Sequence, residues 1–355
     1  MIAERLIQAR KAAGLSVQAL SARAGGVVTA QAISKYEKNK CKPTSTTLLA
    51  LAKALNVRTE FFFRPVTVEL GPIHFRRHSR VPAKTLGMIE GRTRDFVERY
   101  LTLEGVFPEG RFPIFANPLK DRRAQSPKDV EARAEELRRR WNLGWDSIPN
   151  MTELLEEHGV KVIFIEGEVG FDGLFTNVQG KIPVIVVGKE WPGERQRMTL
   201  AHELGHLVLL LDGPTKVQEA AVKHLAGAFL IPAVTARAEL GERRTSLNWG
   251  ELFTLKRKYG VSAKAWLMRA KDLGIIEAGK FVSLLKYYNM RGWNRGEPNP
   301  LVQEEPTRFR RLLYQGLEEG FLTETKAAEL DGQPLRTFLH MMAIEEAAFA
   351  NHPRG

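Results

Sequence analysis

Three residues near the middle of the chain, His202, Glu203 and His206, follow the H-E-x-x-H pattern. Residues i and i+4 of a helix lie one above the other, so both imidazoles can reach one zinc ion at about 2.0 to 2.1 Å. Glu203 then leans toward the place of a zinc-bound water and could take its proton as that water attacks a carbonyl. The pattern therefore predicts zinc-dependent peptide hydrolysis.

The alternative is a chance occurrence of the pattern. At the histidine usage of this chain, it would arise somewhere in 355 residues in roughly one per cent of cases. The segment around the motif is also apolar and helix-like, and histidines buried there would need hydrogen-bond partners. We therefore favour a metal site. Because Cys41 is the single cysteine, the site cannot be a cysteine cluster.

A catalytic zinc takes three protein ligands and keeps one position open. The candidates for the third ligand are Asp212, Glu219, His224 and Glu239. Glu219 is favoured because it shares the apolar face of a predicted helix over residues 217–230, where a cation would relieve the cost of burying a carboxylate. His224 points to the opposite side of that helix, and we expect it to be a solvated surface residue.

The elements ahead of the motif must position it. Residues 160–165 read as a strand, and residues 173–178 and 182–187 as a hairpin that turns at Gln179 and Gly180. We expect the strand over residues 182–187 to be an exposed edge on which an extended peptide lies, the alternative being a strand paired on both sides. Helices predominate after it, which predicts an α+β domain with a small sheet.

Residues 1–66 read as a run of short helices with cap signals at Ser16 and Thr29. Two short helices around a Gly-containing turn form a helix-turn-helix. Residues 1–64 hold 11 Lys/Arg and three acids, so most of the net charge of +12 lies at the front of the chain. Such a segment suits contact with phosphates, although charge alone fits a merely soluble basic domain equally well.

The stretch from "RKAAGLSVQAL" to "LALAKALNV" resembles the XRE-type, lambda-repressor-like DNA-binding family. This resemblance implies that the helix beginning at Thr29 lies in the major groove, with Ile33 buried beneath it. The turn "AGGVVT" departs from the family pattern by one extra residue, because the family commonly has a single Gly there. The positions that would face DNA are Thr29, Ala30, Gln31, Ser34 and Lys35, with Gln18 touching a phosphate.

A second stretch, "TLAHELGHLVL" followed by "EAAVKHLAGAFLIP", is similar to the ImmA/IrrE metallopeptidase family, whose members often carry an XRE-type module. By this resemblance His202 and His206 are zinc ligands, Glu203 is the general base and Glu219 is the third ligand. The resemblance further implies that the substrate is itself a regulatory protein, such as a repressor.

We expect an α+β, mostly helical chain, with an N-terminal all-α helix-turn-helix domain, a zincin-like domain with a small sheet and a helical C-terminal region. The expected boundaries are 1–66 for the helix-turn-helix, 67–126 for a connecting region, 127–290 for the metallopeptidase and 291–355 for a helical extension. Within the connecting region, the Pro-rich stretch before residue 127 reads as a linker, or as an extended arm packed on the next domain. The tail contains "AAELDGQPLRTF", a faint helix-turn-helix pattern for which a structural helical pair is the favoured alternative.

The sequence thus predicts a DNA-binding transcription regulator that carries a zinc-dependent endopeptidase. Two alternatives stay open: a regulator whose zinc domain senses a signal without appreciable peptidase activity, and the antitoxin half of a toxin pair. The expected partners are double-stranded DNA, a protein substrate and a second copy of the chain, because XRE-type modules commonly read two-fold symmetric sites. We expect a cytoplasmic setting, no membrane segment, and self-cleavage near Arg122 and Arg123.

Overall fold

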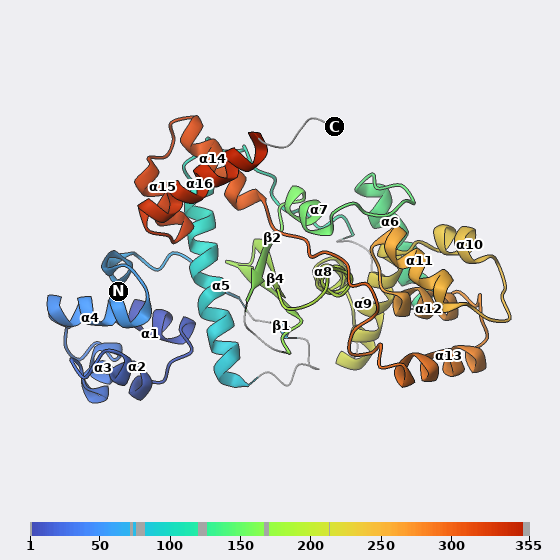
Figure 1. The fold of residues 1–355 in the computed structure, drawn as a ribbon, viewed down its shortest axis with the longest axis horizontal. Coiled ribbons are helices and arrows are strands. Elements are labelled where there is room, and N and C mark those ends of the chain that lie inside the picture. The colour runs from blue at the N-terminus through green and yellow to red at the C-terminus, as the bar shows by residue number, and fades with distance from the viewer. Residues whose placement is uncertain are drawn as a thin grey trace. The chain divides into compact units, whose positions relative to one another are not determined.

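The computed structural model describes residues 2–71, 74–75, 82–119, 126–166, 170–212 and 214–350 (Figure 1). It divides the chain into two compact units. Unit 1 comprises Met1–Gly71, Arg80–Phe112 and Thr307–Gly355, and unit 2 comprises Pro72–Ser79 and Pro113–Pro306. Each unit is therefore assembled from segments that are far apart in the sequence.

The first part of unit 1 is the predicted bundle of short helices. It consists of α1 (Ile2–Ala12), α2 (Val17–Arg23), α3 (Ala30–Glu37), α4 (Ser45–Leu55) and the 3-10 helix η1 (Thr59–Phe63). Ser16 and Thr29 cap α2 and α3, each accepting a backbone N–H of its own first turn, so both predicted caps are confirmed. The core is closed by the fully buried side chains of Leu6, Leu20, Ile33, Leu51 and Phe62.

The second part of unit 1 joins the long helix α5 (Ala83–Glu104) to three C-terminal helices, α14 (Arg308–Glu318), α15 (Glu324–Asp331) and α16 (Leu335–Ala350). Tyr100 and Leu103 of α5 share one apolar cluster with Phe309, Leu313 and Phe338. The helix-turn-helix-like "AAELDGQPLRTF" is thus α15 and the start of α16, packed as a helical layer on α5.

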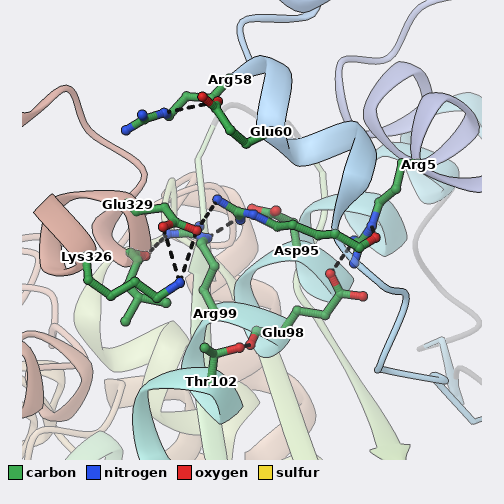
Figure 2. A network of polar contacts seen from close by, with 11 residues as sticks. Arg5, Arg58, Glu60, Asp95, Glu98, Arg99, Thr102, Lys326 and Glu329 are labelled. Atoms are coloured by element: carbon green, nitrogen blue, oxygen red, sulfur yellow. Dashed lines mark hydrogen bonds and ion pairs between the residues drawn. The ribbon is translucent and has the colours of Figure 1, made fainter. Parts of the chain in front are cut away.

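Polar contacts, of which the one at Arg5 is buried, tie the two parts of unit 1 together (Figure 2). Arg5 of α1, 1% exposed, forms an ion pair with Glu98 of α5 and donates from Nε to the Arg64 carbonyl at 3.0 Å. Arg64 in turn pairs with Glu329 of α15 at 2.6 Å, and Arg99 of α5 donates to the Leu330 carbonyl at 2.8 Å. The helix-turn-helix bundle, α5 and α15 are therefore parts of one packed body.

Unit 2 is built around a four-stranded sheet with strand order β1-β3-β4-β2. Its strands are β1 (His74–Phe75), β2 (Lys161–Ile165), β3 (Gly173–Val178) and β4 (Ile182–Gly188). β3 and β4 form the predicted antiparallel hairpin, while β2 runs parallel to β4. Gln179 and Gly180 both adopt the left-handed conformation that this tight turn requires.

The expectation that β4 is an exposed edge is wrong. β4 pairs with β3 on one side and with β2 on the other, so that Val186 lies between Leu174 and Ile163. Its consecutive apolar residues from Val184 to Val187 are fully buried, as is typical of an interior strand covered on both faces.

Eight helices surround the described strands of unit 2: α6 (Pro127–Arg140), α7 (Met151–Glu157), α8 (Gly193–Val208), α9 (Thr215–Leu230), α10 (Ala233–Leu240), α11 (Trp249–Tyr259), α12 (Ala263–Asp272) and α13 (Ala278–Met290). α8 packs on β3 and β4, and α9 packs on α8. The α+β, mostly helical fold class is confirmed. Among the residues with a described placement, no helix combines the length and apolar character that a membrane span requires.

Two extended segments complete unit 2. Residues 113–119 of the Pro-rich stretch lie against this unit, where Asn117 donates to the Val208 carbonyl at 3.1 Å. These residues therefore form the extended arm that was the alternative to a linker. Residues 297–304 pass the start of α8, where Gly193 donates to the Leu301 carbonyl, and Glu304 accepts from the first N–H groups of α7. Arg122 and Arg123, the expected self-cleavage region, lie outside the described residues.

Candidate metal centre

Helix α8 carries the H-E-x-x-H residues and is fixed at both ends. At its start, Gly193 donates to the Leu301 carbonyl at 3.0 Å, and Glu194 accepts from the Leu301 N–H at 2.9 Å and from Lys256 at 2.6 Å. At its end, Asn117 donates to a carbonyl of the last turn. These contacts fix both ends of the helix, which is what a precise ligand set requires.

The side chains of His202, His206 and Glu219 converge on one point. The Nε2 atoms of the two histidines are 3.3 Å apart, and the Glu219 carboxylate oxygens lie 3.4 Å from His202 Nε2 and 3.2 Å from His206 Nε2. In the part of the chain that the structure describes, this is the one group of three His, Cys, Asp or Glu side chains with ligand atoms close enough to share a metal ion.

The spacing of these atoms fits zinc. Four tetrahedral ligands at about 2.0 to 2.1 Å from a zinc ion lie about 3.3 to 3.4 Å from one another. The three observed separations, 3.2 to 3.4 Å, match that value closely. Two imidazoles and one carboxylate are also a donor set that zinc prefers, and three ligands leave a fourth position open.

Glu219 reaches the histidines because α9 approaches α8 closely at Gly205. A Cβ at this position would lie 2.8 Å from Val222 Cγ1 and 3.5 Å from Val222 Cα. Val222 is fully buried and follows Glu219 by three residues, hence on the same side of α9. A glycine inside a helix costs stability, and here its missing side chain is what lets the Glu219 carboxylate come within reach of the two histidines.

A buried polar cluster holds the opposite side of α9. His224 Nε2 lies 2.9 Å from Glu131 Oε2 on α6, and Arg269 of α12 forms an ion pair with the same carboxylate. Burial alone would raise the pKa of Glu131, but hydrogen bonds and charge from His224 and Arg269 outweigh it and lower that pKa to about 2. His224 is therefore a half-buried structural residue, and the expectation of a solvated one is wrong.

The other ligand candidates do not reach the centre. Glu239 is bound to Lys258 Nζ and to the Tyr259 hydroxyl, each at 2.6 Å, and these contacts lower its pKa. Asp212 lines a cavity of about 490 Å³ together with His224 and is not one of the three converging residues.

Glu203 lies beside the ligands, where α8 meets the first residue of β3. Its side chain is 1% exposed, and a Cβ on Gly173 would be 3.7 Å from Glu203 Oε1. The same Cβ would be 2.5 Å from Thr199 Cγ2, so only glycine fits between this strand and α8. The close approaches at Gly173 and Gly205 were not predicted from the sequence. The only signal for them in the sequence is that each of these positions is a glycine.

The helix-turn-helix residues occupy one part of unit 1. Gln18, Thr29, Gln31 and Lys35 are exposed, Ala30 and Ser34 are half-buried, and Ile33 is fully buried. Arg10 of α1 holds α3 through a bidentate contact with Glu37. The extra residue of the turn is accommodated because Gly25 and Gly26 both have positive φ values.

Comparison with known protein families agrees with this geometry. Residues 155–271 match the family model of the IrrE N-terminal-like domain, a peptidase family, and residues 6–62 match a helix-turn-helix model. The chain joins a helix-turn-helix domain to an IrrE N-terminal-like domain. The predicted fusion is confirmed, and no curated protein matches the chain.

The IrrE-like match contains the two histidines, Glu203 and Glu219, together with the sheet from β2 to β4. The helix-turn-helix match implies DNA binding and contains all six candidate contact residues. β1 and the C-terminal helices of unit 1 lie outside both matched ranges.

Proposed function

We propose that this protein is a DNA-binding transcription regulator whose IrrE-like domain is a zinc-dependent endopeptidase. The observation that carries the proposal is the convergence of His202, His206 and Glu219 at separations that suit a tetrahedral zinc ion. The buried Glu203 beside them supports hydrolysis over a purely structural role for the metal, because a structural zinc site needs no adjacent carboxylate that does not ligate it.

Each residue has a distinct role in this proposal. His202 and His206 bind through Nε2, and Glu219 supplies a carboxylate oxygen from α9. A zinc ion bound there would activate water and polarise a peptide carbonyl. Glu203 would accept a proton on its carboxylate and later return it to the amine of the leaving peptide. Since Glu203 is almost fully buried, bulk water would not compete for that proton.

We propose a regulatory protein, such as a repressor, as the substrate, and the cytoplasm as the place of action. Binding of DNA through the helix-turn-helix, with Gln31, Ser34 and Lys35 at base edges and phosphates, would bring the peptidase to proteins bound nearby. A homodimer would match a two-fold symmetric operator. We propose the domain boundaries that the sequence predicts: 1–66 for the helix-turn-helix, 67–126 for the connecting region, 127–290 for the metallopeptidase and 291–355 for the helical extension.

The decisive experiment compares the zinc-loaded protein with its Glu203→Gln variant. Both are incubated with candidate repressors and with a cell lysate, and new protein N-termini are identified by mass spectrometry. Cleavage by the parent protein alone supports the peptidase. Identical patterns, with zinc and DNA still bound, would instead favour a zinc domain that senses a signal, or an antitoxin-like role.

The ligand set is tested independently by metal analysis of purified variants. Substituting His202, His206 or Glu219 by Ala should each reduce bound zinc well below one equivalent. Glu239→Gln is the matched control, since this carboxylate stands outside the converging group, and it should keep full zinc content. Full zinc content in the Glu219→Ala variant would contradict the assigned third ligand.

A further inference from the structure

We propose that the DNA-binding surface of unit 1 continues beyond the helix-turn-helix onto the first turns of α5, where Lys84 contacts a backbone phosphate of duplex DNA. The inference rests on the DNA binding proposed above, and it adds a contact that the helix-turn-helix residues do not include. α5 lies between residue 62, where the helix-turn-helix match ends, and residue 155, where the IrrE-like match begins. Neither family match therefore accounts for the surface of this helix.

α5 packs directly on the end of α1, within unit 1 (Figure 1). A Cβ on Gly91 would lie 2.8 Å from the Ala12 nitrogen and 3.0 Å from Ala12 Cα, so only glycine fits there. One residue further along α5, Arg92 donates from Nε to the Ala12 carbonyl at 3.3 Å. The first half of α5 is therefore fixed on the last turn of α1.

The same face of α5 reaches the turn between α1 and α2. Lys84, Met88 and Arg92 are spaced by four residues, so they lie in one row along the helix. A Cβ on Gly14 would be 2.9 Å from Met88 Sδ and 3.9 Å from Lys84 Cε. The aliphatic stem of Lys84 thus lies against Gly14. Because Lys84 is exposed, its ammonium group faces solvent beside this turn.

This turn leads straight into α2, whose start is expected to touch DNA. Gly14 precedes the N-cap Ser16 by two residues, and Gln18, the candidate phosphate contact, is exposed in the first turn of α2. The Cα atoms of Gly14 and Gln18 are at most about 14 Å apart, since a chain extends by at most about 3.6 Å per residue. A duplex that touches Gln18 would therefore place phosphates within reach of Lys84.

The charges at this turn suit a phosphate. Lys11, in the last turn of α1, is exposed like Lys84 and adds a second positive charge. Glu90, the first acid of α5, forms an ion pair with Arg94 at 3.1 Å. A lysine ammonium is a flexible point charge that binds phosphates whatever the base sequence. Because this surface is continuous with the helix-turn-helix, the partner we assign to it is the DNA backbone.

The measurable consequence is the salt dependence of DNA binding. Each neutralised phosphate releases counterions and contributes about 0.9 to the slope of log K against log salt. Lys84→Gln removes the charge but keeps a long polar side chain, so the slope should become shallower by about 0.9. Non-specific binding is almost entirely electrostatic, and a duplex of random sequence is therefore a sufficient probe.

The experiment titrates the full-length protein and its variants into a fluorescein-labelled duplex of random sequence at several salt concentrations. Lys84→Gln is compared with Lys84→Arg, which keeps the charge and should keep the slope. Lys53→Gln is the matched control, because Lys53 is exposed on α4 and the substitution makes the same change in net charge. Lys35→Gln on α3 reports on contacts made by the helix-turn-helix itself.

A shallower slope for Lys84→Gln, with parent-like slopes for Lys84→Arg and Lys53→Gln, supports the inference. A parent-like slope for Lys84→Gln would overturn it. If Lys35→Gln still made the slope shallower in that case, DNA binding by the helix-turn-helix would stand without the added contact. Absence of duplex binding by the parent protein would overturn both the DNA-binding proposal and this inference.

Chemical labelling gives a second readout that needs no variant. Lysines of the parent protein are acylated with an N-hydroxysuccinimide ester, with and without the duplex, and each labelled position is quantified by mass spectrometry. Contact with a phosphate should lower the labelling of Lys84 several-fold, whereas Lys53 should react equally in both samples. Equal labelling of Lys84 in the free and the DNA-bound protein would contradict the assigned contact.

Discussion

Gly205→Ala should weaken zinc binding although it changes none of the three proposed zinc ligands. The new Cβ would lie 2.8 Å from Val222 Cγ1, about 0.7 Å inside an ordinary carbon–carbon contact. Val222 cannot turn away easily, because a β-branched side chain in a helix has one strongly preferred rotamer. α9 must therefore move outward, and it takes the Glu219 carboxylate with it.

The expected effects on stability and on zinc differ in size. Overpacking a core costs about 1 to 3 kcal/mol, whereas alanine gains up to about 1 kcal/mol over glycine in a helix. The net loss of unfolding free energy should thus be about 0 to 2 kcal/mol. Metal sites tolerate shifts of only about 0.2 Å, so we expect zinc affinity to fall by about 10- to 100-fold, as when other residues that orient ligands are changed.

The assay is competition for zinc against a chromophoric chelator, with urea unfolding of the same samples. Gly279→Ala is the matched control, because a Cβ at this helical glycine meets nothing within 4 Å. This control should bind zinc like the parent protein. If Gly205→Ala also kept the parent affinity, the view that close approach of α8 and α9 positions the third ligand would be refuted.

Three further outcomes are expected. Glu131→Gln should cost about 3 kcal/mol at neutral pH, because it removes the half-buried carboxylate charge whose pKa is lowered to about 2 by His224 and Arg269. Since the pKa of Glu131 falls from 4.5 to about 2 on folding, the parent should lose this advantage as the pH drops from 4.5 toward 2, and urea midpoints of the two proteins should converge there. Lys35→Ala should weaken binding to a labelled DNA duplex and reduce the slope of log K against log salt by about one, unlike Lys53→Ala on α4. Arg5→Met should destabilise unit 1 by about 3 kcal/mol in urea unfolding, and adding Glu98→Leu should recover most of that loss; no recovery would contradict a buried pair.

The convergence of His202, His206 and Glu219 could be predicted because its determinants are local. His202 and His206 are one helical turn apart, and Glu219 follows from the apolar face of a single helix. The capped helices of the front module are local in the same sense. Periodicity shows which way a side chain points, but it does not show what lies opposite. Glu131, the partner of His224, comes from α6, 93 residues earlier in the chain.

Strand neighbours could not be predicted for the same reason. β2 pairs with β4 in parallel, and such pairing depends on a long connection whose path the strand residues do not encode. The sequence also did not indicate which segments of the chain make up unit 1. Arg99 contacts the Leu330 carbonyl across 231 residues, and neither segment taken alone indicates the other.

The interleaved path of the chain affects how unit 1 responds to proteolytic cleavage of unit 2. Unit 1 draws on segments from before and after Pro113–Pro306, and their shared apolar cluster is not interrupted by a break in that stretch. A single proteolytic nick between Pro113 and Pro306 would give two fragments on a denaturing gel, yet the pieces would stay associated through α5 and α14. Inactivation of DNA binding by proteolysis would then require a break within unit 1 itself, or the unfolding of that unit.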